Sequence, residues 1–232
     1  WRLAKNIPDS EQYDSDISAY YIRALSSNDE NIRTKAADSL FEFYSRKEQY
    51  EQAEEYLAYF SEQNPERKRK QALIYSKTNR VKEAYKAYEE LLFSGYQMIN
   101  MVLNSIYMLA LRDKNMEKAH KLVEKQKGLA DIFEMGEYHE ASCSLDLAVS
   151  EKDEKTTIET MERMIAGLDK ICGFAKSTLY EHLEFKDVSD EFKKELHDNL
   201  LTCFKDEETF GYMKNNMRWQ ALVSSAPGLS VQ

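Results

Sequence analysis

A histidine and a cysteine lie one helical turn apart in the sequence, at His139 and Cys143. On a helix this spacing puts the imidazole and the thiol on one face, where both could bind the same zinc ion. A zinc site needs further ligands, but the chain has no CxxC pair and no second histidine four residues from the first. We therefore interpret His139 as a partly exposed histidine and Cys143 as a core residue, and we predict no metal site.

The local motifs that mark common catalytic sites are absent from the chain. It contains no GxSxG, no HExxH, no P-loop and no GxGxxG. An all-α enzyme would have to assemble its chemistry from dispersed carboxylates such as Glu134, Glu137 and Asp146, and only acids that converge in one pocket can do so. We keep that as a third hypothesis and predict that the chain is not an enzyme and needs no cofactor.

Seven lysines and arginines crowd into residues 66–82, where Glu66 is the only acid. Four of them, Arg67 to Lys70, fall in the first turns of an expected helix, where the helix dipole disfavours cations. One interpretation is a basic binding surface. The other, which we favour, is a solvated face whose cations pair with neighbouring glutamates.

The elements that would position these residues repeat along the chain. In residues 34–67, apolar residues at helical spacing precede a polar turn at 46–49, and a second apolar helical pattern closes at Pro65. Residues 65–96 and 100–131 repeat this plan around turns at 78–80 and 113–115. A looser fourth pair surrounds a turn at 152–154. The second helix of each clear pair carries a small residue, at Ala53, Ala84 and Ala119, separated by 31 and 35 residues.

This pattern resembles the tetratricopeptide repeat family, most closely over residues 34–67, where Ala37 and Phe41 replace the family's usual Trp and Gly. The resemblance covers residues 34–131 and implies an all-α superhelix, of about eleven or twelve antiparallel helices. We expect residues 1–13 to form an N-terminal linker, 14–217 the repeat domain and 218–232 a flexible tail. Shorter helices are expected near 175–186 and 206–215, with an N-cap at Ser189 between them.

In such a superhelix the first helix of each pair lines a concave groove. The register predicts a partner-binding groove made by Arg69, Leu73, Lys77, Met101, Asn104, Met108 and Arg112. Other inward positions are Lys35, Asp38, Glu42 and Arg46 in the first pair, Ser76 in the second, and His139, Ser142 and Asp146 in the fourth. Asn104 can both donate to and accept from a peptide backbone.

The first functional hypothesis is a non-catalytic module that binds a peptide or protein in this groove. The whole chain resembles the C-terminal region of bacterial helix-turn-helix transcription regulators, which implies a sensor or dimerisation role and a DNA-binding domain outside this chain. The chain opens with Trp1, which we interpret as the start of a segment from a longer protein. The alternative is a structural scaffold or homodimerisation array without a small ligand.

Composition limits the partners and the cell compartment that we expect for either function. The formal net charge is −9 and 31% of the residues are charged, so the surface repels phosphate backbones and we expect no direct nucleic-acid binding by this segment. No window resembles a membrane span or a signal peptide. Three cysteines without a disulfide pattern favour a reducing compartment. We expect a soluble, cytoplasmic protein with no membrane partner.

Overall fold

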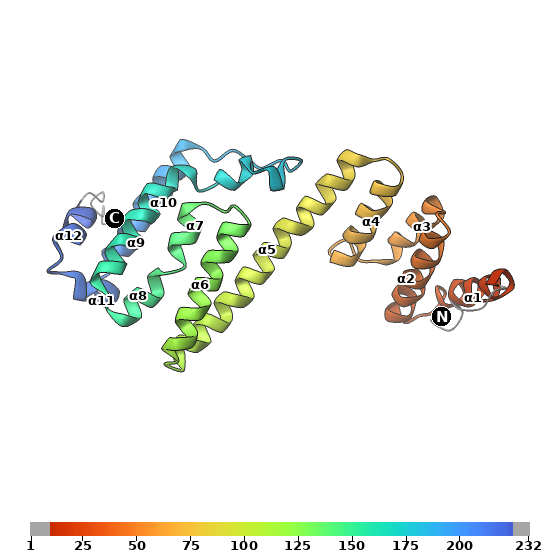
Figure 1. Ribbon diagram of the computed structural model, residues 1–232, viewed down its shortest axis with the longest axis horizontal. Helices are drawn as coiled ribbons and strands as arrows, with labels where there is room; N and C mark the ends of the chain where they lie inside the picture. The colour runs from red at the N-terminus through yellow and green to blue at the C-terminus, as the bar shows by residue number, and fades with distance from the viewer. Residues whose placement is uncertain (1–9, 225–232) are drawn as a thin grey trace. The chain divides into compact units, whose positions relative to one another are not determined.

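The computed structural model describes residues 10–224, and every regular element in that range is helical (Figure 1). The helices run from α1 to α12, with short 3₁₀ helices between some of them, and no strand occurs between residues 10 and 224. The predicted all-α class is confirmed. The sequence explains it, since no proline interrupts residues 66–226.

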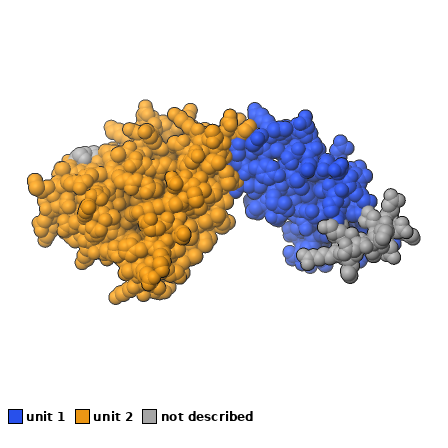
Figure 2. Space-filling view, in the orientation of Figure 1, with its two compact units in different colours: residues 1–91 blue, residues 92–232 orange. Residues whose placement is uncertain are grey.

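The chain divides into two compact units, residues 1–91 and residues 92–232 (Figure 2). The sequence predicted a single repeat domain over residues 14–217, so this division is a difference from the expectation. Each unit has its own buried apolar clusters, and each is described by itself below.

Unit 1 is built from α1 (Ser10–Ala24), α2 (Glu30–Arg46), α3 (Tyr50–Glu55), a 3₁₀ helix (Tyr56–Tyr59), α4 (Pro65–Lys77) and the start of α5 (Val81–Arg112). Its core joins Phe41 of α2, Ala53 of α3, Leu57 of the 3₁₀ helix and Ile74 of α4, all buried. The first two predicted pairs are therefore present as helices. The expected linker over residues 1–13 overlaps α1 from Ser10 onward, and residues 1–9 lie outside the described part.

Unit 2 holds the rest of α5, then α6 (Met116–Ile132), α7 (Glu137–Ser142), α8 (Leu145–Glu151), α9 (Glu154–Gly167), α10 (Asp190–Phe204), α11 (Glu207–Phe210) and α12 (Met217–Ser224). One buried cluster joins Tyr107, Ala119 and Val123 between α5 and α6. A larger one joins α7 and α9 to α10, α11 and α12 around Met161, Phe204 and Trp219.

Helix α5 differs from the sequence prediction. The repeat pattern placed a break between residues 96 and 100, whereas α5 is one helix of 32 residues. Only Gly95 weakens helix formation there, and a single glycine inside a helix costs about 1 kcal/mol. No proline is present there, and the Ser94-Gly95 dipeptide, which can mark a turn, does not end the helix, so the backbone hydrogen-bond ladder continues through the expected boundary.

The four predicted turns share one backbone geometry. Each contains a residue with positive φ, at Glu48, Asn79, Lys114 and Lys152. In each turn the next residue's N–H donates to the carbonyl five residues before it, over 2.9–3.0 Å, which is the Schellman ending of a helix. The next helix begins within two residues of the positive-φ residue, so the two helices are joined by a short turn.

The small buried residue of each second helix lies at a constant distance along the chain from these turns. Five residues after the positive-φ residue come Ala53, Ala84, Ala119 and, in the fourth pair, Thr157, and all four are buried. Thr157 thus occupies the place of the repeat alanine, with its hydroxyl 2.7 Å from the Tyr212 hydroxyl. The turn of the loose fourth pair therefore has the same local geometry as the first three turns, although the helix before it is divided into α7 and α8.

Two expectations for the C-terminal part are wrong in detail. No α-helix covers 175–186; short 3₁₀ helices at Gly173–Lys176 and Thr178–Tyr180 lead into an irregular stretch. Aromatic packing among Phe93, Phe174 and Phe185, with ring centroids 5.2–5.5 Å apart, holds this segment against α5 in place of helical hydrogen bonds.

The flexible tail expected over residues 218–232 overlaps α12, which continues to Ser224. Trp219 is buried there and its indole N–H donates to the Phe204 carbonyl over 3.0 Å. Residues 225–232 lie outside the described range. The predicted N-cap at Ser189 is present and accepts from the Phe192 N–H.

Candidate functional site

A cavity of about 440 Å³ in unit 2 is lined by residues of α5, α6 and α7, and we call it the α5–α7 cavity. Met101 and Asn104 of α5, from the predicted groove, line it together with His139 and Ser142 of α7, which the register also placed inward. The other lining residues are Phe93, Tyr96, Gln97, Asn100, Gln126, Met135, Cys143 and Phe174. The wall combines apolar side chains with several carboxamides, as sites for organic ligands do.

Gln126 is the least expected residue of this wall. Its side chain is 5% exposed, and its Oε1 has no hydrogen-bond partner among the described residues. A buried acceptor left unsatisfied costs about 1–3 kcal/mol. A donor that enters the cavity, from a ligand or from water, would remove that cost, so Gln126 favours an occupant with an N–H or O–H group.

His139 is held as a neutral donor at the edge of the same cavity. Its Nε2 lies 3.2 Å from the carbonyl oxygen of Ile171, which can only accept, so Nε2 carries the proton. Burial lowers the pKa of His139 below its ordinary value of 6.5. The neutral imidazole then keeps an unprotonated Nδ1 and packs edge-on against Phe174.

Cys143, which the sequence analysis interpreted as a core residue and not as a zinc ligand, lies in a largely closed environment. Its thiol donates to the His139 carbonyl over 3.2 Å, and burial raises its pKa. A thiol of raised pKa is a poor nucleophile and a poor metal ligand at neutral pH. Over residues 10–224 no cluster of three or more His, Cys, Asp or Glu side chains could hold a metal ion.

The predicted groove residues divide between the two units. Arg69, Leu73 and Lys77 lie on α4 in unit 1, where Leu73 packs against the core. Met101, Asn104, Met108 and Arg112 lie on α5 in unit 2, and only the first two line the cavity. Met108 is 48% exposed, and Arg112 lies 3.8 Å from Asp113 at the end of the helix. The groove as a whole remains a prediction.

The basic segment 66–82 is extensively paired with acids of unit 1. Arg69 contacts Glu66 at 2.9 Å, which holds the pKa of that carboxyl low, and Lys68 contacts Glu90 at 2.6 Å. Further ion pairs join Arg67 to Glu62 and Arg80 to Glu54. These contacts support the interpretation of a solvated face with paired charges over that of a basic binding surface.

Lys70 of this segment is part of the core. Its side chain is 1% exposed, and its Nζ lies 2.8 Å from Asp38 and 2.7 Å from Glu42. The same ammonium lies 4.3 Å from the centre of the Phe41 ring. Asp38 and Glu42, expected to face a partner, are therefore engaged in holding α4 against α2.

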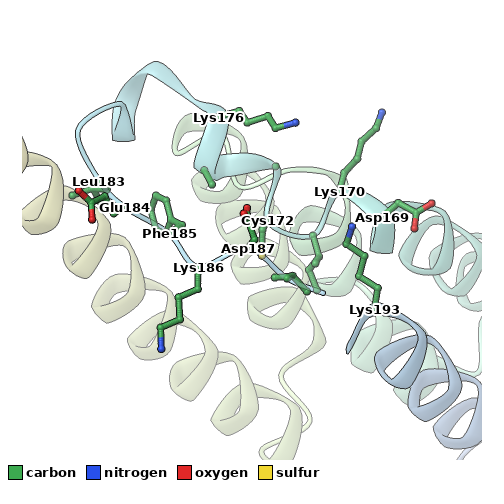
Figure 3. A pocket seen from close by; sticks show the side chains of 14 residues that line it. Asp169, Lys170, Cys172, Lys176, Leu183, Glu184, Phe185, Lys186, Asp187 and Lys193 are labelled. Carbon is green, nitrogen blue, oxygen red and sulfur yellow. The ribbon is translucent and has the colours of Figure 1, made fainter. Parts of the chain in front are cut away.

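A larger cavity, of about 770 Å³, lies along the irregular stretch between α9 and α10. Its wall includes Lys170, Lys176, Lys186 and Lys193, together with Asp169, Glu184 and Asp187. Figure 3 shows the lysine side chains pointing in different directions instead of converging on one point. Mixed charges without a common target favour the smaller cavity as the candidate site.

The dispersed acids of the enzyme hypothesis line neither of the two cavities described above. Glu134 follows the end of α6 in a positive-φ turn, Glu137 pairs with Arg163 at 3.2 Å, and Asp146 lies on α8. None of the three lines the 440 Å³ cavity. The structure offers no pocket that joins them among the cavities described above.

Sequence reasoning missed Gln126, Met135 and Phe174. A signal for Gln126 exists, since Ala119, Val123, Gln126 and Ala130 form the buried stripe of α6 and the glutamine is its polar member. Phe174 carried no signal, because it reaches the cavity through an irregular segment that no periodicity describes.

No family model matches the chain, and searches of the curated proteins and of the solved structures find no match. Among residues 10–224, no helix has both the length and the apolar character that crossing a membrane requires. The function is therefore argued from the site.

Proposed function

We propose that this chain is a non-catalytic helical repeat module of the tetratricopeptide type that binds a peptide or protein segment in the α5–α7 cavity. The observation that carries the proposal is the convergence on one cavity of Met101, Asn104, His139 and Ser142, which the repeat register had placed inward. A repeat fold that presents inward side chains of successive helix pairs to one site is typical of peptide recognition.

The chemistry of the cavity favours an extended peptide. Asn100, Asn104 and Gln126 offer carboxamides, each of which can donate to and accept from a peptide bond. Met101 and Met135 offer flexible apolar surface that adapts to different side chains. The α5–α7 cavity is large enough for one or two residues of the partner, and the rest would lie on the surface.

The proposed setting is regulatory. The resemblance to helix-turn-helix regulators supports a role as the sensor part of a bacterial transcription regulator, in the cytoplasm, with DNA contacted by another domain. The net charge of −9 supports the same division of labour, because it disfavours phosphate contacts by this segment.

A display library of short random peptides tests the proposal. We expect selected peptides to bind the chain and to lose at least about tenfold in affinity, about 1.4 kcal/mol, when Asn104 becomes alanine. Asn199→Ala, on α10 and away from the cavity lining, is the matched control and should leave affinity unchanged. An equal loss of affinity in both variants, or an affinity that Asn104→Ala leaves unchanged, would mean that the peptides bind elsewhere.

The alternative of a scaffold or homodimerisation array without a small ligand also has support, from a different face of α5.

A further inference from the structure

The part of α5 within unit 2 exposes an apolar stripe on a different face from the α5–α7 cavity. Leu92, Ile99, Val102 and Leu109 are 36–47% exposed, and Ile106 between them is half-buried. With Gly95 they are spaced alternately three and four residues apart, which is the spacing of a coiled-coil seam. We call these six residues the α5 stripe; none of them lines the cavity.

The exposed area suits a protein interface. With neighbouring Met98, 58% exposed, the stripe presents on the order of 400 Å² of apolar surface, which is as large as the largest apolar patch on many monomers. A standard interface takes about 800 Å² from each partner, somewhat more than half of it apolar. The stripe and its polar margins therefore supply about one side of such an interface.

Charge identifies the kind of partner. Residues 91–111 contain no Asp, Glu, Lys or Arg, in a chain of which 31% is charged. Depletion of charge, with methionines and aromatics retained, is the compositional mark of an interface core. A charged partner would bury unpaired charges on this face, which is costly. A second copy of the chain brings the same uncharged, apolar surface.

Gly95 supports close helix-to-helix contact on this face. A Cβ atom added there would meet nothing within 4 Å, and the residue has no positive φ. Nothing within the described chain therefore requires glycine, although it weakens α5 by about 1 kcal/mol relative to alanine. The absence of a side chain lets the backbone of another helix approach.

From these observations we propose that the α5 stripe is a self-association surface, along which two copies of the chain pair helix to helix. Upstream, in unit 1, α5 also exposes Val81, Tyr85 and Tyr88 at the same spacing, but the proposal uses only the part in unit 2. It is independent of the peptide-binding proposal, since pairing through the stripe leaves the cavity-lining face of α5 unused.

Sedimentation equilibrium of the full chain gives the first test. The mass should be twice 27.2 kDa, and the double variant Ile99→Glu, Val102→Glu should be monomeric with unchanged helicity. Ile132→Glu, at the end of α6 and 71% exposed, is the matched control and should stay dimeric. A monomeric parent chain at high concentration, or a dimer that survives the double substitution, overturns the proposal.

A cysteine at the middle of the stripe tests the same contact without adding charge. Val102 lies near the centre of the stripe, so it meets its counterpart whether the two helices are parallel or antiparallel. Mild oxidation of Val102→Cys should therefore give a covalent dimer well above the background from the three native cysteines. Ile132→Cys should give only that background.

The result at Val102→Cys also identifies other occupants of the stripe. A monomer whose new thiol reacts freely would show a bare surface, and a monomer whose thiol is protected would show cover by another part of this chain. Equal cross-linking of both cysteine variants would show random collision. Each of these three results overturns the proposal.

Discussion

At the scale of single residues, Lys70 is the clearest case of charge used to hold helices together. Its ammonium is buried between two half-exposed carboxylates, Asp38 and Glu42. Removing the negative charge of both carboxylates leaves a buried cation without an opposite charge, which costs about 3–5 kcal/mol. Removing the lysine instead leaves two acids that water can reach, at a smaller cost of about 1–2 kcal/mol.

We therefore expect the double variant Asp38→Asn, Glu42→Gln to destabilise the chain more than Lys70→Met, as measured by urea unfolding. Lys35→Met, an exposed position on the same helix as both acids, serves as control and should change the stability by less than about 0.5 kcal/mol. The reverse order of the two main variants would mean that Lys70 is not held by these acids.

His139 gives a pH-dependent prediction at the same scale. Burial lowers its folded-state pKa below 6.5, so the unfolded chain binds the proton more readily than the folded chain does. The stability contributed by neutral His139 is complete above pH 6.5 and is lost as the pH falls below 6.5 toward the folded-state pKa. His139→Gln keeps a donor for Ile171 but cannot be protonated in this range.

The melting temperature of the parent chain should accordingly fall more steeply below pH 6.5 than that of His139→Gln. The comparison removes the effect of other acid-titrating groups, which both chains share. Melting temperatures that fall equally with pH in both chains would contradict the neutral state of His139.

At the scale of elements, the four Schellman turns place ordinary residues where glycine is preferred. Glu48, Lys114 and Lys152 have φ between 55° and 58°, a conformation that costs an L-residue with a Cβ on the order of 1 kcal/mol. Replacing each by glycine should stabilise the chain by about 0.5–1 kcal/mol in urea unfolding.

Asn79 occupies the same position in the second turn with φ 60°. Asparagine tolerates the left-handed region better than glutamate or lysine, so Asn79→Gly should change stability least. A loss of stability in Lys114→Gly or Lys152→Gly would mean that these turns are not the helix endings described above.

The elements also show what the sequence could and could not predict. Helical periodicity and the turn residues predicted the four turns, because each turn depends on local backbone chemistry. The break inside α5 was predicted from the repeat period, and its one local signal, Ser94-Gly95, is not strong enough to end the helix. The helix predicted near 175–186 was wrong, because aromatic packing between Phe93 and Phe174, far apart in sequence, decides the path of this segment.

The site was predictable to the extent that it follows the repeat register. Met101, Asn104, His139 and Ser142 were placed inward by counting from the helix pairs, and they line one cavity. Pairing of the cations in residues 66–82 was the favoured interpretation, but a sequence does not show which acids of other helices take part, such as Glu90 beside Lys68. Gln126 needed the buried face of α6 to be known first.

At the scale of the whole molecule, we propose that one face of α5 binds a peptide and another face binds a second copy of the chain. The cavity face carries Met101 and Asn104 toward α6 and α7, and the α5 stripe carries Ile99 and Val102 toward a second copy. The two proposals can fail separately, because peptide binding and molecular mass are measured independently and the variants share no residue.

The central claim, that the α5–α7 cavity binds a peptide, is tested most directly by methyl NMR of the chain labelled at its nine methionines. Met101 and Met135 line the cavity, whereas Met161 is in another core cluster and Met217 is 82% exposed on α12. Adding a peptide selected by display should shift the Met101 and Met135 signals and leave those of Met161 and Met217 in place. Saturable binding that shifts the methyl signal of Met217 or Met161, while the signals of Met101 and Met135 stay unchanged, would contradict the account.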